Sequence, residues 1–342
     1  MIVRIGLLGA ILIAGNLWAH NRHVWESSHY IWDFGLISAC DLGIDRNPER
    51  YFSGEPTFNK HAYRNIKSGD LVWVQCRFIP DFCRDILPML RVPIVLLVSD
   101  GDESFPSDCG NQFNIHPLLE NPNIIHIFAQ NYDMACVHPK ISHIPIGTDF
   151  HTSAYKGREG GWGECGSPLE QEARLRNILN HLKPTNLRKK RAFVDFHHAD
   201  TMHGGFKRYL QFGEDRASIF RKIMASGLID HDSWMRRSKL WEVKGEYAFS
   251  VSPHGNGLDC HRTWEDLILG CIVIVRSSPL DPLYEGLPVV IVKDWSEITP
   301  ANLDRWLAQF GDAFTNPSYR EKLTNRYWLA KMRGVAQSYR SN

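Results

Sequence analysis

Residues 249–275 read FSVSPHGNGLDCHRTWEDLILGCIVIV. In this stretch an apolar run ends at Pro253, a loop with two glycines follows, and the pattern then predicts a helix over 262–270 and a buried strand over 271–275. Backbone N–H groups at a helix start attract anions, and glycine lets a ligand approach the backbone closely. The stretch therefore predicts an α/β fold with an anion site between a strand and a helix.

Short apolar runs alternate with polar, turn-forming segments on both sides of this stretch. The first set is LVWVQC, PIVLLVSD, IIHIFAQN and HIPIG, beginning at residues 71, 93, 124 and 143. The second set is AFVDFH, YAFSVSP, CIVIV and LPVVIV, beginning at residues 192, 247, 271 and 287. Such runs are typical of buried parallel sheets, so we expect an α/β protein with two Rossmann-like domains facing across a cleft.

The chain divides at a segment of different character. Residues 156–191 are Gly-rich at first, then carry a helical pattern with a capping box that begins at Ser167, and end in the basic run RKKR. We therefore expect a first domain at 20–180, a second at 185–315 and one long amphipathic closing helix within 316–342.

The composition excludes several classes of protein. With 43% hydrophobic residues and a net charge of +1 over 342 residues, the chain is neither disordered nor able to hold a polyanion by a general positive field, so no nucleic acid partner is expected. Eight cysteines without a CxxC pair exclude a zinc ribbon. Their even number permits disulfides without requiring them.

The first residues read as a targeting segment. Residues 1–19, MIVRIGLLGAILIAGNLWA, are a short basic start, an apolar run and a small final residue, as in a secretory signal peptide or a short membrane anchor. A buried first strand is the alternative, although the segment after Ala19 lacks the expected Gly-rich turn. We expect the secretory pathway, which means the Golgi or endoplasmic reticulum lumen in a eukaryote, with attachment to the membrane if the segment is retained.

The side chains of the quoted loop and helix suit a diphosphate. His254, His261 and Arg262 supply positive or hydrogen-bonding groups, and Glu265 lies one turn further on, where it can accept hydrogen bonds from ribose hydroxyls. The candidate binding residues of this stretch are His254, Gly255, Asn256, Gly257, His261, Arg262 and Glu265.

Each feature has a simpler structural interpretation. The two glycines could only form a turn, and Arg262 and Glu265 could form an exposed ion pair on the helix surface. A zinc site made by His254, Cys260 and His261 is disfavoured, because only three ligands are local and neighbouring positions at a helix start point in different directions.

The stretch SPHGNGLDCHRTWEDLILGCIVIVRSSPLDPLYEGLPVVIVKDW, residues 252–295, resembles the C-terminal donor-binding region of exostosin-like glycosyltransferases. That family has a strand, a polar Gly-containing loop, an Arg and an acidic residue on a helix, and then GCIPV, which reads GCIVI here. IFAQN and IPIGTD resemble the end of the first half in related sequences. The resemblance covers residues 246–296 and, more weakly, 93–150, while the first 90 residues contribute almost nothing.

The resemblance implies a GT-B enzyme that transfers a sugar from a nucleotide-sugar donor to a glycan or glycoconjugate acceptor, without a further cofactor. Its second domain would grip the donor, with Glu265 on the ribose and His261 or Arg262 on the diphosphate. A basic loop, HHADTMHGGFKRYL, follows the first strand of that domain, where such enzymes place another diphosphate ligand. Arg208, with Lys207 behind it, is the candidate there, and a solvated connection is the alternative.

Such a transfer does not require a metal ion if fixed cations stabilise the leaving phosphate. We expect an inverting reaction in which a carboxylate or a histidine takes the proton of the acceptor hydroxyl. Asp100 ends an apolar strand and ranks first, Asp102 second and His116 third. The alternatives for Asp100 and Asp102 are a turn or helix cap and a metal-binding DxD motif, and we expect no metal there.

Two other classes of function compete with glycosyl transfer. A nucleotide-dependent oxidoreductase would need a GxGxxG fingerprint directly after a strand, and the sequence contains none. A catalytically inactive glycan-binding relative would keep the same fold, and only turnover distinguishes it from an enzyme.

Overall fold

The structure is a computed structural model that describes residues 28–43, 57–110, 113–134, 138–155, 164, 166–198, 215–232 and 235–340. The expected targeting segment at 1–19 and the candidates Lys207 and Arg208 lie outside these residues. No helix within the described ranges is both long and apolar enough to cross a membrane.

The first domain is built on a parallel sheet that has four strands within the described residues, in the order β1-β2-β3-β4. The strands are β1 (Asp70–Gln75), β2 (Ile94–Ser99), β3 (Ile124–Ala129) and β4 (Ile141–His143). Both faces of β1 are buried, since Leu71 and Trp73 belong to one core and Val72 and Val74 to another. Burial on both faces explains why the runs read as continuously apolar.

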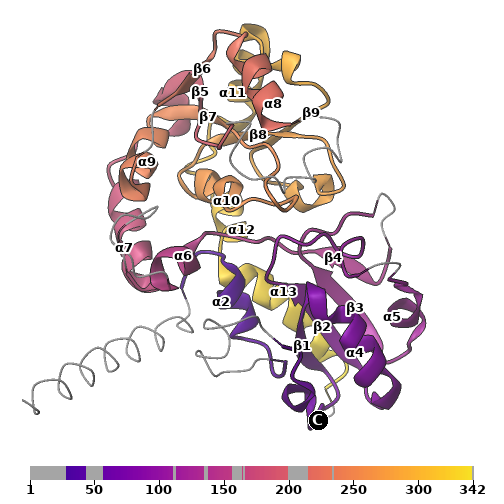
Figure 1. The fold of residues 1–342 in the computed structure, drawn as a ribbon. Helices are drawn as coiled ribbons and strands as arrows, with labels where there is room; N and C mark the ends of the chain where they lie inside the picture. Colours follow the sequence, from indigo (N-terminus) through magenta and orange to yellow (C-terminus); the bar gives the residue numbers. More distant parts are fainter. Residues whose placement is uncertain are drawn as a thin grey trace, which may run out of the picture.

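Helices cover both faces of this sheet, as Figure 1 shows. On one face lie α4 (Ile79–Asp85) and α5 (His116–Glu120), whose Phe82 and Leu118 enter the core. On the other lie α2 (Asp33–Ile37) and the last helix, α13 (Asn325–Gln337). The end of the chain therefore returns to complete the first domain.

The second domain holds a parallel sheet of five strands among the described residues, in the order β6-β5-β7-β8-β9. The strands are β5 (Lys189–Val194), β6 (Ile229–His231), β7 (Tyr247–Val251), β8 (Ile272–Arg276) and β9 (Val289–Val292). Counted within the domain this order is 2-1-3-4-5, which reverses direction between β5 and β7. Ligands of such sheets bind beyond the carboxyl ends of the two strands at the reversal.

Helices also enclose the second sheet (Figure 1). Its helices are α8 (Arg216–Met224), α9 (Arg237–Lys244), α10 (His261–Ile268) and α11 (Pro300–Phe310), while α7 (Pro168–Leu179) packs against α6 (Phe150–Tyr155) and α9. The capping box predicted at Ser167 is present at the start of α7. The expectation of an α/β protein with two Rossmann-like domains is confirmed, and the domain boundaries themselves stay predictions.

One expectation about the last residues is wrong. The predicted single closing helix is divided into α12 (Pro317–Lys322) and α13, with Leu323 and Thr324 between them. The Thr324 hydroxyl accepts a hydrogen bond from the Tyr327 N–H and so caps α13. An N-cap at this position starts a new helix, which can then turn toward the first domain.

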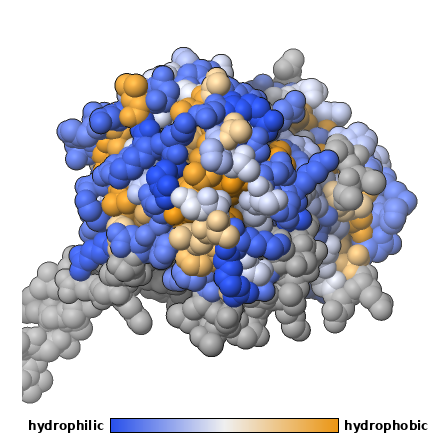
Figure 2. Space-filling model, turned by 90° about the horizontal axis from the view of Figure 1, so that it is seen from above, coloured by the Kyte–Doolittle hydropathy of each residue, from blue (hydrophilic) through white to orange (hydrophobic). Residues whose placement is uncertain are grey.

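The face of the molecule in Figure 2 is a mosaic of hydrophilic surface and small apolar areas. The large apolar side chains that the described residues expose are scattered over both domains and include Met89, Leu169 and Leu187. Scattered exposure of this kind is normal for a folded protein.

Candidate functional site

The carboxyl end of the first sheet contacts the quoted loop of the second domain. The Asp259 N–H donates to Asn131 Oδ1 at 2.8 Å, and Asp259 Oδ2 accepts from the Ile146 N–H at 2.9 Å. His261 Nδ1–H donates to the Gly147 carbonyl at 2.7 Å. The loops after β3 and β4 thus meet the loop between β7 and α10, where both parallel sheets present their carboxyl ends.

The two glycines of the loop fit these contacts. A Cβ on Gly255 would lie 2.9 Å from the Cys260 sulfur, and one on Gly257 would lie 2.8 Å from Asn131 Nδ2 and 3.1 Å from the Asp102 carbonyl. The Gly255 N–H donates to the Gly257 carbonyl at 2.9 Å. This N–H is therefore used within the loop, whereas we expected backbone N–H groups here to face an anion. The glycines permit close packing of the loop, including against Asp102, which is distant in sequence.

Arg262 lies at the reversal point of the second sheet. Asp195 directly follows β5, and its carboxylate binds Arg262 Nε at 2.7 Å and Lys244 Nζ at 2.8 Å. Lys244 also binds Asp266 at 2.7 Å, and the Ser250 hydroxyl of β7 donates to Asp266. The network ties the ends of β5 and β7 to α9 and α10, and it fixes the guanidinium of Arg262.

The charges in this network support one another. Burial alone would raise the pKa of Asp195, but Lys244 and Arg262 outweigh it and lower that pKa. Burial would likewise lower the pKa of Lys244, yet the carboxylates of Asp195 and Asp266 raise it to about 12. Lys244 is 1% exposed, so its charge depends on these partners.

Glu265 has a different partner from the one the helix spacing suggested. It forms a buried ion pair with Arg237 of α9, accepts a hydrogen bond from the Trp241 indole at 2.8 Å and accepts another from the Asp149 N–H at 3.2 Å. The alternative of an exposed Arg262–Glu265 pair is wrong, because each residue pairs elsewhere. Glu265 is only 4% exposed, and its hydrogen bonds connect the two domains. Its contact with a ribose stays a prediction.

A cluster that the sequence analysis did not single out lies at the same interface. His151 Nδ1 is 3.2 Å from Asp149 Oδ1, and the rings of His151 and His261 are 5.3 Å apart. Burial opposes the charged imidazole, but the carboxylates of Asp149 and Asp33 outweigh it and raise the pKa of His261. Burial also opposes the charge of Asp149, yet His151, His261 and Arg237 lower its pKa. A carboxylate beside an imidazole can move a proton.

The cluster also bears on metal binding. Asp149, His151 and His261 offer ligand atoms within 4.8 Å of one another. Among the described residues, these three form the group of His, Cys, Asp or Glu side chains that could hold a metal ion. It does not include His254 or Cys260, so the disfavoured zinc site has no support there. Asp149 ends the motif IPIGTD and His261 belongs to the quoted stretch, whereas no sequence signal pointed to His151 or to Asp33, whose charge acts on His261.

Asp100 lies at the end of β2, as its position in the sequence predicted. Its backbone has a φ of 65°, and its carboxylate accepts a hydrogen bond from Gln75 Nε2 at 2.9 Å. Burial, and then the charges of Asp33, Glu103 and Asp102, raise the pKa of Asp100 well above its usual value. Asp102 is exposed, which agrees with its lower rank, and His116 is an exposed residue of α5 next to Glu120.

The remaining candidates of this loop, His254 and Asn256, differ in their burial. His254 is half-buried, and its Nδ1–H donates to the Leu258 carbonyl at 2.7 Å. The His254 carbonyl accepts from Arg216 Nε at 3.0 Å, which brings a second guanidinium to the loop from the start of α8. Asn256 is exposed at the tip of the loop. Arg216 was missed because it lies in a polar stretch without a motif.

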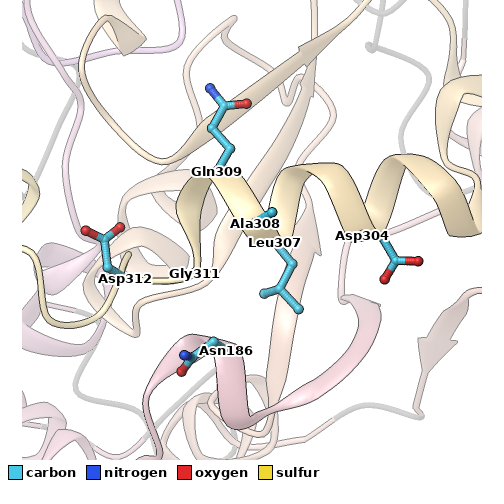
Figure 3. A pocket seen from close by; sticks show the side chains of 7 residues that line it. All are labelled: Asn186, Asp304, Leu307, Ala308, Gln309, Gly311 and Asp312. Atoms are coloured by element: carbon cyan, nitrogen blue, oxygen red, sulfur yellow. The ribbon is translucent and has the colours of Figure 1, made fainter.

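A surface hollow of about 580 Å³ lies elsewhere on the second domain, beside α11. Figure 3 shows its lining, in which Asp304 and Asp312 project from α11 and from the turn after it, and Asn186 lies opposite. Asp304 pairs with Lys190, and Asp312 accepts a hydrogen bond from the Asn316 amide. None of the candidate residues lines this hollow.

No protein-family model matches the chain. No curated protein matches it significantly either. Resemblance to the exostosin-like family therefore remains a prediction from the residues.

Solved structures similar to the chain have been found. One described as a GtfA/B complex has a TM-score of 0.35 at 11% identity, covering 80% of this chain and 58% of that one. The pneumococcal O-GlcNAc transferase GtfA in complex with UDP and GlcNAc has a TM-score of 0.36 at 12% sequence identity. This match covers 82% of this chain and 60% of that one. The catalytic domain of starch synthase IV from Arabidopsis thaliana, bound to ADP and acarbose, has a TM-score of 0.32 at 10% sequence identity. This match covers 78% of this chain and 72% of that one. The chain thus spans less than two thirds of the first two, and scores this low assign no activity.

Proposed function

We propose that the protein is a glycosyltransferase that moves a sugar from a nucleotide-sugar donor to a hydroxyl of a glycan or glycoconjugate. The observation that carries this proposal is the position of Arg262. Its guanidinium is fixed by Asp195 at the reversal point of the second sheet, and the carboxyl end of the first sheet lies opposite. A nucleotide site is favoured at this point of a doubly wound sheet, and a fixed cation there suits a diphosphate.

The donor diphosphate would contact Arg262, with Arg216 as a second cation on the neighbouring helix start. His254, Gly255, Asn256 and Gly257 form the loop between them, and Lys207 and Arg208 keep the role that the resemblance implies. Negative charge develops on the diphosphate as the sugar leaves, and fixed guanidinium groups stabilise that charge without reorganising. We therefore propose a transfer that needs neither a metal ion nor a further cofactor.

The acceptor hydroxyl must lose a proton during an inverting transfer. Asp100 is the proposed base, because it lies at the end of β2 and its buried carboxyl has a raised pKa, which makes the carboxylate a stronger base. The Asp149–His151 pair is a second candidate at the same interface. Asp102 ranks below both because its side chain is exposed.

The donor panel is the direct test of this proposal. The full chain is incubated with a set of nucleotide-sugars, with and without acceptor glycans, and the released nucleoside diphosphate is measured. We expect one donor to turn over, with release that increases when a suitable acceptor is present and falls in Arg262→Ala. Tight donor or glycan binding without any turnover would support the inactive glycan-binding relative instead.

The secretory pathway remains the proposed location. A reporter fused after residue 19 tests it, since the proposal requires that the reporter enter that pathway and a purely cytosolic reporter would contradict it.

A further inference from the structure

Two cysteines lie side by side in the core of the first domain. The sulfurs of Cys76 and Cys109 are 3.0 Å apart, and the two residues are 4% and 1% exposed. A disulfide bond requires a shorter separation by about 1 Å, which small side-chain rotations can supply. The pair therefore needs no rearrangement of the backbone to become covalently joined.

Cys76 and Cys109 lie close to the proposed base Asp100, one after β1 and the other in the loop after β2. Cys76 follows Gln75, the last residue of β1, whose amide donates to Asp100. The Cys76 thiol also lies 3.9 Å from the Ser104 carbonyl, in the segment that leads from Asp102 to Cys109. A bond between these cysteines would tie the loop after β2 to the end of β1.

Among the cysteines that the structure describes, Cys40, Cys83 and Cys271 do not offer an equal alternative. The thiols of Cys40 and Cys271 are directed to backbone carbonyls of Leu36 and Lys244 in other parts of the core. Burial, and then the charge of Cys109, raise the pKa of Cys83 in α4, so Cys83 lies near Cys109 and is the competitor to test.

We propose that Cys76 and Cys109 form a structural disulfide when the folding chain meets a disulfide oxidant, such as oxidised glutathione or an oxidised dithiol protein. The thiolate of one cysteine attacks a sulfur of the oxidant and releases one thiol. The second cysteine then attacks the mixed disulfide and releases the other. The two cysteine sulfurs are oxidised, the oxidant is reduced to two thiols, and the two protons leave with those thiols.

The timing of this step follows from the environment of Cys76. Its hydrogen bond with Cys109, and then burial, raise the pKa of the Cys76 thiol far above its usual value. The thiolate is the reactive form, so exchange is slow once the core has closed. The bond therefore forms during folding, and a chain that folds in a reducing medium keeps both thiols and oxidises slowly afterwards.

The test is a map of free and bonded cysteines in the full chain. One sample is refolded in a glutathione redox buffer and another in excess reductant. Both are denatured, alkylated without reduction, digested and analysed by mass spectrometry. We expect a linked Cys76–Cys109 peptide in the oxidised sample alone, with Cys40, Cys83 and Cys271 alkylated in both. Alkylation of Cys76 and Cys109 in the oxidised sample, or a Cys83–Cys109 linkage, would overturn the proposal.

Matched variants give a second measurement. Cys109→Ser should release Cys76 for alkylation and lower the melting temperature of the oxidised protein by roughly 5 °C, to near that of the reduced wild type. Cys83→Ser is the control and should keep the linkage and the difference between oxidised and reduced protein. Equal melting temperatures of oxidised and reduced wild type would show that the bond adds no stability. The inference does not depend on the proposed transfer of a sugar.

Discussion

Arg262 and Asp195 form an ion pair of 2.7 Å at the reversal point of the second sheet, although α8, β6, α9 and β7 lie between them in the described part of the chain. The pair points Nε of the guanidinium at a protein carboxylate, while Nη1 lies 3.5 Å from the Ser252 hydroxyl and 3.5 Å from the Pro253 carbonyl. A guanidinium fixed in this way loses little entropy when it binds a phosphate.

Arg262→Ala should therefore lower kcat/KM for the nucleotide-sugar by roughly 10- to 100-fold, the value of a charge-assisted hydrogen bond, and by more than Arg208→Ala does. The measurement is steady-state release of the nucleoside diphosphate. Arg84→Ala is the control, since Arg84 is an exposed residue paired with Asp81 and Asp85 in the first domain. A larger effect of Arg208→Ala would move the main phosphate contact into the 197–210 loop.

Lys244→Met should lower the free energy of unfolding by about 3 to 5 kcal/mol, because it leaves Asp266 buried without a cation and Asp195 with Arg262 alone. Urea unfolding measures this change. Lys190→Met removes a cation that pairs with Asp304 at the surface and should cost less than about 1 kcal/mol. Similar losses in the two variants would mean that the buried network contributes no more than a surface pair.

The proposed base predicts a separation of binding from catalysis. Asp100→Asn should keep donor affinity and reduce the transfer rate by about 10² to 10⁴, because the amide cannot accept the proton. Isothermal calorimetry with the donor and single-turnover kinetics provide the two readouts. His151→Gln is made in parallel, and if it alone reduces the rate, the base is His151. Loss of folding in Asp100→Asn would assign Asp100 a structural role in the turn.

The raised pKa of His261 predicts a pH dependence of stability. A group whose pKa is higher in the folded state stabilises the protein below its unfolded value of 6.5, and this contribution is lost as the pH rises through the folded pKa. Wild type should therefore lose stability relative to His261→Gln as the pH rises above 6.5 and through the raised pKa of His261. Urea unfolding of both proteins at several pH values tests this. A difference that is constant with pH would show that His261 is neutral in the folded state.

Chelation tests the proposal that the chain supplies its own cations. Dialysis against EDTA should leave the transfer rate unchanged, since guanidinium groups hold the diphosphate. If the rate falls and returns with a divalent cation, the Asp149, His151 and His261 cluster becomes the place to look, because its three side chains offer nitrogen and oxygen ligands.

The strands and α10 could be predicted from sequence because apolar runs of strand length report burial on both faces of a parallel sheet. The position of Arg262 also followed, since a helix after a Gly-containing loop fixes where its first turn lies. The partners of these residues did not follow. Arg237 pairs with Glu265 from another helix, and Asp33 comes close to His261 from a distant part of the chain. Such contacts depend on tertiary packing, which local spacing does not encode.

The closing helix shows the same limit. Its amphipathic pattern runs through residues 316–334, and only the cap at Thr324 reveals that the chain begins a second helix. A threonine inside a helical pattern is too common to be a reliable signal, because it caps a helix only if its own backbone is extended, as that of Thr324 is.

The place of α13 also determines the order in which the protein can be made. Trp328 and Met332 of this helix belong to the same core as Leu71 and Trp73 of β1. During synthesis, the amino-terminal sheet therefore emerges from the ribosome with one face covered only by α2, and this face lacks α13 while the whole second domain is translated. In topological terms the second domain is an insertion between β4 and α13, so it can close first, and the first domain is completed only after α13 has been translated.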